Sequence, residues 1–484
     1  MKLTFWGAAR QVTGSMYLLE LEDGFKILID CGTDLDQQKM EREKTLGHYS
    51  LFPFEPSEIN LVLLTHAHID HSGNLPNLVK DGYEGQILCT TATMPLAELL
   101  LRDSAMLNAK RAKELENAPS TKGKKNRNNK NKKKPFRFNP QELYLEAQVV
   151  ETADRFVTVG FNQKFKVSKN VNVTFIPTGH LLGAANIVLE INENGAKKTI
   201  GFSGDIGRKN YPLLLDPQRM PPVDYLLCES TYGSRRHTNK EAPVEALEKV
   251  IRQTCVDQPG RLIIPAFSVG RTQALLFVLN KLYTTEGFPP IKVFSDSPLA
   301  LQSTKVYEKN VHLLNDEAKD FYAKNEELFD FENLTYVQDM KQSKAIANYA
   351  DPCIIISSSG MISGGRVEHH VMTNLANSLA TILLVGFAAE GTLGYKLLHG
   401  MKSLSITKEK EIPVLASIQS IDVFSGHGDL DDLTEFVEYQ SPETLKKVFL
   451  VHGEYASMQS FQQHLNQRGY ANVEIPQWGE EFEL

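Results

Sequence analysis

The motif His-Ala-His-Ile-Asp-His at residues 66–71 places four potential metal ligands within six residues. It follows the apolar run Leu-Val-Leu-Leu-Thr at 61–65, which has the character of a buried strand in a parallel sheet. Its first two histidines converge only if the backbone curls, as it does in a loop. The aspartate and the third histidine come where a helix would begin, so they can face a second point. This spacing predicts a loop that supplies ligands to two metal ions.

Further candidate ligands share one position, the carboxyl end of an apolar strand. They are His180, Asp205, Glu229 and His452, which follow predicted strands at 171–177, 199–203, 225–228 and 448–451. In α/β sheets, binding sites form beyond the carboxyl ends of the strands. Each residue alone is equally well explained as an ordinary polar residue at a strand end. Together with the motif they predict a single site.

These residues supply the imidazoles and carboxylates that a two-metal centre needs. We assign His66, His68 and His180 to one ion, and Asp70, His71 and His452 to the other. Asp205 is expected to bridge the ions, with a bridging hydroxide as the nucleophile. Asp30, at the end of a predicted strand, is expected to orient a metal-bound histidine. Two Zn²⁺ ions suit the histidine-rich set best, although Mn²⁺ or Fe²⁺ also bind such sites.

The elements that must position these residues follow two patterns of secondary structure along the chain. A hairpin is predicted over 15–30 with an Asp-Gly turn, then a strand at 86–90, a helix at 94–116, and mostly strands up to 230. From about 235, helices and strands alternate. They comprise helices at 241–255 and 271–283, and strands at 261–265, 291–295, 352–357 and 381–385. This pattern predicts a doubly wound α/β unit. It should be an insertion, because short strands resume from about 411.

Composition and charge limit the classes of protein to which this chain can belong. Hydrophobic residues make up 42% of the chain, and the net charge of −7 gives no general nucleic-acid signal. Residues 122–134 (KGKKNRNNKNKKK) hold eight Lys or Arg, so the remainder carries −15 (−7 minus 8). The composition of residues 122–134 predicts a loop that is either a solvated insertion or an arm that binds polyanions.

Cysteine usage and the N-terminus indicate a soluble cytoplasmic protein. The chain has five widely spaced cysteines and no Cys-x-x-Cys, so neither a disulfide framework nor a structural zinc cluster is expected. Reduced cytosolic thiols fit best. No signal peptide and no apolar run of about 18 residues is present, so no membrane association is expected.

The motif at 66–71, with His180 and Asp205 downstream, resembles the metallo-β-lactamase superfamily. Three further matches narrow the resemblance to its β-CASP family: Glu229 in Glu-Ser-Thr-Tyr-Gly, His427 in Phe-Ser-Gly-His-Gly-Asp and His452 in Val-His-Gly-Glu. Because it has histidine at the third of these positions, the chain resembles the RNA-processing branch. That branch includes the eukaryotic pre-mRNA 3′-end cleavage nuclease and bacterial and archaeal relatives. The DNA-repair branch typically has an aliphatic residue there.

The resemblance implies an α/β fold: a metallo-β-lactamase αββα sandwich with an inserted, doubly wound β-CASP domain. The expected domains are 1–230 and 411–484 for the metallo-β-lactamase part and 231–410 for the β-CASP part. It also implies a metal-dependent ribonuclease that acts on single-stranded RNA and leaves 5′-phosphate and 3′-hydroxyl ends. An endonuclease is favoured, although an exonuclease is not excluded. A homodimer is left open.

The chemistry of RNA hydrolysis assigns roles to three residues. Loss of the leaving group needs a proton, and His427 is the candidate general acid because histidine titrates near neutral pH. Glu229 is expected to orient His427 and favour its protonated form. Asp70 is counted among the catalytic residues as well as the metal ligands.

Weaker signals predict contacts to substrate phosphates. Ser268 and Arg271 lie in a turn that joins a strand to a helix, where free backbone N–H groups suit an anion. Ser358 and Arg366 lie in a second stretch rich in serine and glycine. Ordinary turns have the same composition.

Two other functions compete with the ribonuclease. A small-molecule ester or thioester hydrolase of the same superfamily would share the metal ligands, but it would not need the inserted α/β domain. A catalytically idle RNA-binding or scaffold subunit would be marked by degraded ligand motifs. Every expected ligand is present here.

Overall fold

The computed structural model describes residues 1–34, 51–116, 144–238, 241–285, 287–386, 388–405 and 411–484. They form two compact units, one of Met1–Val159 with Pro476–Leu484, the other of Gly160–Ile475. The lysine-rich run at 122–134, predicted as a loop, lies outside the described residues. None of the described helices is both long and apolar enough to cross a membrane.

The first unit is built on a seven-stranded sheet, sheet A, in the order β22-β1-β2-β3-β4-β5-β6. Its strands are β1 (Lys2–Phe5), β2 (Tyr17–Glu20), β3 (Lys26–Ile29), β4 (Leu61–Leu63), β5 (Gln86–Thr90), β6 (Phe156–Val159) and β22 (Glu481–Glu483). The predicted hairpin is confirmed as β2 and β3, with Gly24 at φ +84 in the turn. From β3 to β6 all neighbours are parallel, so their carboxyl ends share one edge.

The described part of the first unit also holds the α-helices α2 (Ile69–Ser72), α3 (Leu75–Lys80), α4 (Thr93–Glu116) and α5 (Glu146–Ala153). The helix predicted at 94–116 is confirmed as α4. Leu101 and Ala105 of α4 pack against Tyr144 and Val149 at α5. The short helix α2 begins inside the motif at 66–71 and carries its last two ligand-type residues, Asp70 and His71.

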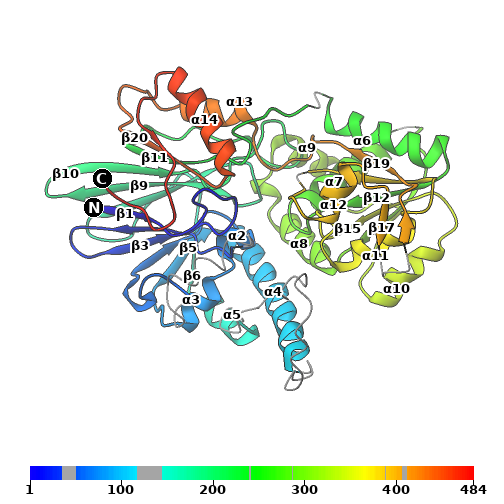
Figure 1. Cartoon of the computed structure of the whole chain (residues 1–484), viewed down its shortest axis with the longest axis horizontal. Helices are drawn as coiled ribbons and strands as arrows, with labels where there is room; N and C mark the ends of the chain where they lie inside the picture. Colours follow the sequence, from blue (N-terminus) through cyan, green and yellow to red (C-terminus); the bar gives the residue numbers. More distant parts are fainter. Residues whose placement is uncertain (35–50, 117–143, 239–240, 286, 387, 406–410) are drawn as a thin grey trace, which may run out of the picture. The chain divides into compact units, whose positions relative to one another are not determined.

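The second unit contains another seven-stranded sheet, sheet B, in the order β21-β20-β11-β10-β9-β8-β7. Its strands are β7 (Lys164–Lys166), β8 (Val171–Pro177), β9 (Ala185–Glu193), β10 (Ala196–Phe202), β11 (Tyr225–Glu229), β20 (Lys447–Val451) and β21 (Val473–Glu474). Helices α13 (Leu430–Glu438) and α14 (Tyr455–Gln467) cover one face (Figure 1). Phe436 and Phe461 bury their rings against Leu226 and Leu450 of this sheet.

The second unit also contains sheet C, in the order β14-β13-β15-β12-β16-β19, with every neighbouring pair parallel. Its strands are β12 (Arg261–Pro265), β13 (Lys292–Asp296), β14 (Leu334–Tyr336), β15 (Cys353–Ser357), β16 (Ala380–Leu384) and β19 (Ser417–Ser420). A small hairpin of β17 (Ser403–Ser405) and β18 (Glu411–Pro413) lies beside it.

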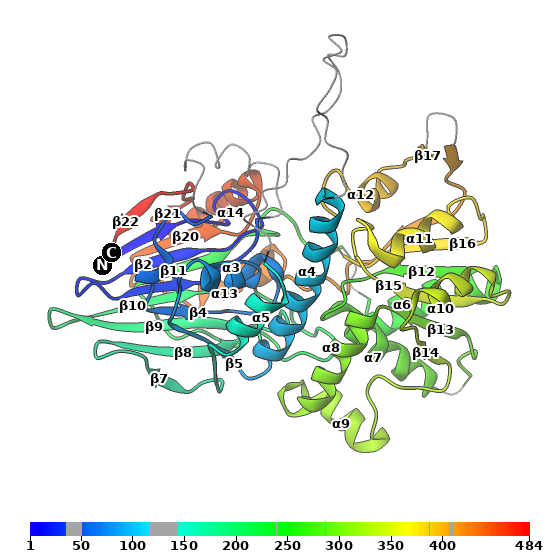
Figure 2. The same ribbon diagram turned by 90° about the horizontal axis from the view of Figure 1, so that it is seen from below.

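Helices lie on both faces of sheet C, which confirms the doubly wound prediction. They are α6 (Pro243–Ile251), α7 (Arg271–Tyr283), α8 (Pro298–Lys309), α9 (Asp316–Asn325), α10 (Met340–Ala345), α11 (Gly365–Asn374) and α12 (Leu393–Leu398). α7 and α8 lie on one face, and α11 and α12 on the other (Figure 2). The helix predicted at 241–255 ends as an α-helix at Ile251 and continues as a π-helical turn, Arg252–Asp257.

The chain leaves sheet B at the end of β11 and returns to it at β20, the strand that pairs with β11. All strands of sheet C lie between these two in sequence. Sheet C is therefore an insertion into sheet B, as the change near residue 235 from mostly strands to alternating helices and strands predicts. The domain boundaries at 230 and 410 stay predictions.

Candidate metal centre

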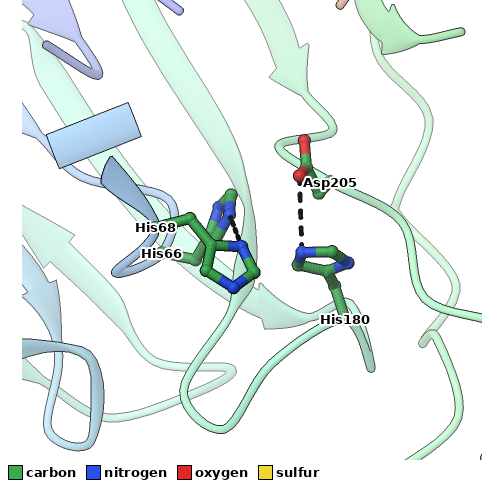
Figure 3. A group of neighbouring side chains, drawn as sticks. All are labelled: His66, His68, His180 and Asp205. Atoms are coloured by element: carbon green, nitrogen blue, oxygen red, sulfur yellow. Dashed lines mark hydrogen bonds and ion pairs between the residues drawn. The ribbon is translucent and has the colours of Figure 1, made fainter. Parts of the chain in front are cut away.

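The motif at 66–71 occupies the loop between β4 and α2 and the first turns of that helix, at the carboxyl edge of sheet A. His66 is buried, and its Nε2 lies 3.1 Å from Nδ1 of His68 (Figure 3). The rings of His66 and His71 have centroids 4.1 Å apart. Two nitrogens on one tetrahedral zinc ion lie roughly 3.3 Å apart. His66 and His68 are therefore spaced as two ligands of one ion.

Asp30, which follows β3, fixes the orientation of two of these histidines. Its Oδ2 accepts hydrogen bonds from Nδ1 of His71 at 2.7 Å and from the Thr65 hydroxyl at 2.8 Å. That hydroxyl in turn accepts one from Nδ1 of His66 at 3.1 Å. Because Nδ1 of each ring donates, Nε2 carries the lone pair that a metal needs. The contact that the predicted role of Asp30 requires is therefore present, and the orientation of a metal-bound histidine by Asp30 stays a prediction.

A second set of ligand-type residues lies at the carboxyl edge of sheet B. His180 follows β8, Asp205 follows β10 and His452 follows β20, and all three side chains are buried. Oδ2 of Asp205 lies 3.4 Å from Nε2 of His180 (Figure 3). Oδ1 of the same carboxylate lies 3.6 Å from Nε2 of His452. The two oxygens of Asp205 thus face different imidazoles, which is the arrangement a bridging carboxylate requires.

The histidines of this second set are held through Nδ1 as well. Nδ1 of His180 donates to the carbonyl of Gly426 at 2.8 Å. Nδ1 of His452 donates to the Thr231 hydroxyl at 3.1 Å, and that hydroxyl donates to the His452 carbonyl at 3.1 Å. Asp30 and His452 also share a left-handed backbone, with φ of +59 and +50. Each unit therefore presents Nε2 lone pairs from imidazoles whose rings cannot turn freely.

The donor set fits a divalent metal ion. Imidazole nitrogens and carboxylate oxygens are the ligands that zinc, manganese and iron share in proteins. Hydrogen bonds to the opposite ring nitrogen, as seen at His66, His71, His180 and His452, are what metal-bound histidines usually make. The His and Asp side chains of the described chain are thus suited by type, burial and tautomer to bind metal.

Glu229 and His427 form a pair beside Asp205. The Glu229 carboxylate is buried and accepts hydrogen bonds from the backbone N–H of Ile206 at 2.6 Å and from Nδ1 of His427 at 3.1 Å. The His427 side chain is 19% exposed, and its Nε2 lies 4.0 Å from Asp205. The three residues offer ligand atoms within 4.8 Å of one another. Glu229 and His427 are in contact, as the proposed orienting role requires.

Two of the predicted phosphate contacts meet at a residue that the sequence did not single out. The hydroxyls of Ser268 and Ser358 lie 3.2 Å and 3.0 Å from that of Ser297. These serines follow β12, β15 and β13, three strands that neighbour one another in sheet C. Ser297 also caps α8 by accepting from the Ala300 N–H. The rule that strand ends carry sites applies to Ser297 too and could have found it.

Arg271, the first residue of α7, lies near His180. Its guanidinium stands 5.4 Å from the centroid of the Phe267 ring. A Cβ added to Gly386 would come within 2.0 Å of it, and one added to Gly426 would lie 3.8 Å from it and 3.5 Å from the His180 ring. Glycine at 386 leaves the room that this side chain occupies.

Arg366 makes contacts that the sequence did not predict, and its proposed phosphate contact stays a prediction. Its guanidinium donates to the buried carboxylate of Asp296 at 2.6 Å and to the carbonyls of Val337 and Gln338 at 3.1 Å and 2.7 Å. The same carboxylate accepts from Nε2 of His370 at 2.6 Å. These contacts favour a structural role for Arg366, because both terminal nitrogens of its guanidinium donate to neighbouring groups.

Comparisons with known proteins agree with this geometry. Family models match three successive stretches: the metallo-beta-lactamase superfamily at 9–158, the Beta-Casp domain at 272–397, and the Zn-dependent metallo-hydrolase RNA specificity domain at 411–476. Ribonuclease TTHA0252 from Thermus thermophilus is 31% identical over 482 residues, 99% of each chain. The chain belongs to the β-CASP family of the metallo-β-lactamase superfamily. The resemblance inferred from the motifs is confirmed, and so is the α/β fold class.

More distant members of the β-CASP family also match. Transcription termination factor FttA from Methanocaldococcus jannaschii is 27% identical over 95% of this chain and 68% of its own length. Cleavage and polyadenylation specificity factor 73 from Drosophila melanogaster is 27% identical over 93% and 60%. A protein of unknown function from Enterococcus faecalis V583 shares the fold, with a TM-score of 0.53 at 13% identity over 100% of this chain and 99% of that one.

Replacing Asp30 with Asn should weaken metal binding by about 10- to 100-fold, because the amide cannot hold Nδ1 of His71 and the Thr65 hydroxyl as a carboxylate does. Metal affinity of the stripped protein, measured by titration with Zn²⁺, checks this. Asp23→Asn, in the turn between β2 and β3, is the control and should bind like the wild type. Equal affinity in both variants would contradict a role for Asp30 in orienting the ligands.

Replacing Asp296 with Asn should destabilise the second unit by about 3–5 kcal/mol at neutral pH, since it leaves His370 and Arg366 without their carboxylate. Burial acts to raise the pKa of Asp296, but hydrogen bonds from His370, Ser343 and Arg366 outweigh it and lower that pKa below 3.8. The stabilisation is therefore present above 3.8 and is lost as pH falls through the folded-state pKa.

Urea unfolding from neutral pH to about pH 3 measures this difference between wild type and Asp296→Asn, which should shrink only at the acid end. Asp316→Asn, whose side chain is 95% exposed, is the control and should change stability little at any pH. A difference that stays constant with pH would contradict the assignment of a charged Asp296.

Proposed function

We propose that this protein is a metal-dependent ribonuclease that hydrolyses RNA phosphodiesters. The observation that carries the proposal is the pair of buried Glu229 and half-buried His427 beside Asp205, because it adds a proton donor to a set of metal ligands. The match to an RNA specificity domain and the relatives named as ribonuclease and as cleavage factor support RNA as the substrate.

The ligand-type residues are proposed to hold two divalent ions. His66, His68 and His180 would bind one, and Asp70, His71 and His452 the other, with Asp205 between them. The opposed orientation of the two Asp205 oxygens supports this division. Zn²⁺ is the proposed metal, in keeping with the zinc-dependent family model, and Mn²⁺ and Fe²⁺ are the alternatives.

The bound ions would lower the pKa of a water molecule and offset the charge of the phosphate. The chain's own residues supply the rest of the reaction. The water gives up one proton to solvent and attacks phosphorus as hydroxide, and the bond from phosphorus to the 3′ oxygen breaks. Asp70 is proposed as a catalytic residue as well as a ligand. The 3′ oxygen takes its proton from Nε2 of His427, while Glu229 holds Nδ1. The products are a 5′-phosphate and a 3′-hydroxyl.

The RNA strand is proposed to contact the β-CASP segment through hydroxyl groups and one arginine. Ser268, Ser297 and Ser358 form a cluster of hydroxyls at the carboxyl edge of sheet C. Arg271 lies beside Gly426, whose carbonyl holds His180. Small hydroxyls and a guanidinium are suited to phosphate oxygens, and single-stranded RNA offers a phosphate at every nucleotide.

A small-molecule ester or thioester hydrolase is not favoured. It would use the same ligands, but neither the inserted sheet C nor the RNA specificity domain would be needed. Comparing cleavage of single-stranded RNA with that of chromogenic esters separates the two functions. An idle scaffold subunit is also disfavoured, because each predicted ligand position carries a ligand-type residue.

A cytoplasmic location and a homodimer are proposed as well. All five cysteines are buried and carry free thiols, which suits a reducing compartment. Fractionation of cells and light scattering of the purified protein test the two proposals.

The mode of cleavage is tested with RNA labelled at one end and carrying either a 5′-triphosphate or a 5′-monophosphate. The metal content of the purified protein is measured first. A ladder of internal cuts identifies an endonuclease, which is the favoured mode. Release of mononucleotides that depends on the 5′ group identifies an exonuclease.

Replacing His68 with Ala should remove the metal ion that His68 helps to bind. The rate of RNA cleavage should fall with it, by about a hundredfold or more. Metal content by mass spectrometry and cleavage of labelled RNA are read from the same preparation. His399→Ala removes an exposed histidine and should leave both unchanged. Cleavage that survives without metal would refute the metal-dependent mechanism.

Replacing His427 with Ala should keep the metal but slow RNA cleavage by about 10²- to 10⁴-fold, because the leaving oxygen then departs without a proton donor. Metal content and single-turnover rates on RNA check this. Normal cleavage by His427→Ala would show that another group donates the proton.

A further inference from the structure

Each residue of the segment 235–238 is hydrogen-bonded to the stretch 422–431, which contains the loop of His427 and the start of α13. The Arg235 carbonyl accepts from the Leu430 N–H at 3.0 Å. Arg236 donates twice to the Asp431 carboxylate, at 2.7 Å and 2.9 Å. The His237 N–H donates to Asp429 at 2.9 Å, and Thr238 donates through its N–H and hydroxyl to Asp422 at 2.6 Å and 2.9 Å.

The ring of His237 lies inside this contact. Its side chain is 9% exposed, and its Nε2 donates to the backbone carbonyl of His427 at 3.0 Å. Nδ1 faces Asp422 at 3.8 Å, and the ring packs edge-on against Tyr232. Burial and the nearby Arg208 lower the pKa of His237 below its usual value, which keeps the ring neutral at pH 7.

The loop around His427 needs such support. His427 lies between Gly426 and Gly428, and no helix or strand includes it. Glycines on both sides add no side chain that could restrict the backbone. The Ser425 hydroxyl reaches the same carbonyl only at 3.5 Å. Glu229 holds the His427 ring through Nδ1, and His237 holds its backbone, so the two contacts together fix where Nε2 points.

We propose that His237 is a positioning residue for proton donation by His427, acting through its Nε2–H bond to the His427 carbonyl. The inference rests on the proposed ribonuclease function and extends it to a residue that makes no contact with the candidate metal ligands in the described hydrogen bonds. It predicts a defect confined to substrates whose leaving group needs a proton.

Two substrates separate positioning from general stability. RNA has a poor leaving group, whereas bis(4-nitrophenyl) phosphate releases an acidic phenol that needs little protonation. The ratio of kcat on RNA to kcat on the aryl ester cancels the fraction of folded protein. Two amide variants are compared. The Gln amide nitrogen occupies the place of Nε2, and the Asn amide nitrogen that of Nδ1.

His237→Asn should lower this ratio by about tenfold with an unchanged KM for RNA, while His237→Gln restores most of it. Asp422→Ala loosens the segment but keeps the His237 ring, and it should lower the ratio in the same direction by a smaller factor. It answers the question if His237→Asn fails to fold. His464→Asn, at a partly exposed position on α14, is the control and should leave the ratio unchanged.

A fall in both kcat values by the same factor in His237→Asn, or a ratio equal to that of the wild type, would overturn the positioning role. If the proposed ribonuclease function is wrong, the same assays give a different result. In that case the wild type hydrolyses the aryl ester and leaves RNA intact, and the inference about His237 falls with it.

Discussion

The chemistry available to this chain depends on which nitrogen each imidazole donates from. A neutral histidine has one lone pair, and it lies opposite whichever nitrogen carries the hydrogen. His66, His71, His180 and His452 all direct Nδ1–H at an oxygen of the protein. The oxygens are supplied by Thr65, Asp30, Gly426 and Thr231. The tautomers are thus set before any metal binds, which lowers the cost of assembling the ligands.

The two seven-stranded sheets serve this constraint in the same way. Each brings the carboxyl ends of parallel strands to one edge, so residues far apart in sequence become neighbours. In sheet B, β11 and β20 pair directly, with Glu229 opposite Val451, and this places Glu229 beside His452. Because the insertion of sheet C begins and ends at these adjacent strands, the pairing of β11 with β20 brings its two ends together.

Much of this arrangement could be predicted from the sequence. The strands that carry ligands are short apolar runs with a polar residue at the end, and the motif at 66–71 has a spacing that few other structures require. The partners that orient the ligands could not be predicted so well. Thr231 and His452 are 221 residues apart, and their contact depends on strand pairing rather than on local pattern. The contacts of Arg366 could not be predicted either, because its partner Asp296 is 70 residues away.

The left-handed backbone at Asp30 and His452 has a consequence for how such a site changes over generations. Asp, Asn and His enter this conformation more readily than other residues with side chains, and β-branched residues enter it worst. A substitution to Val or Ile at 452 would thus remove the imidazole and strain the turn that follows β20. Drift at these two positions should pass through Asn or Gly first, and an aliphatic residue at 452 calls for a differently shaped turn. The backbone therefore filters which mutations the site can accept, independently of any selection on activity.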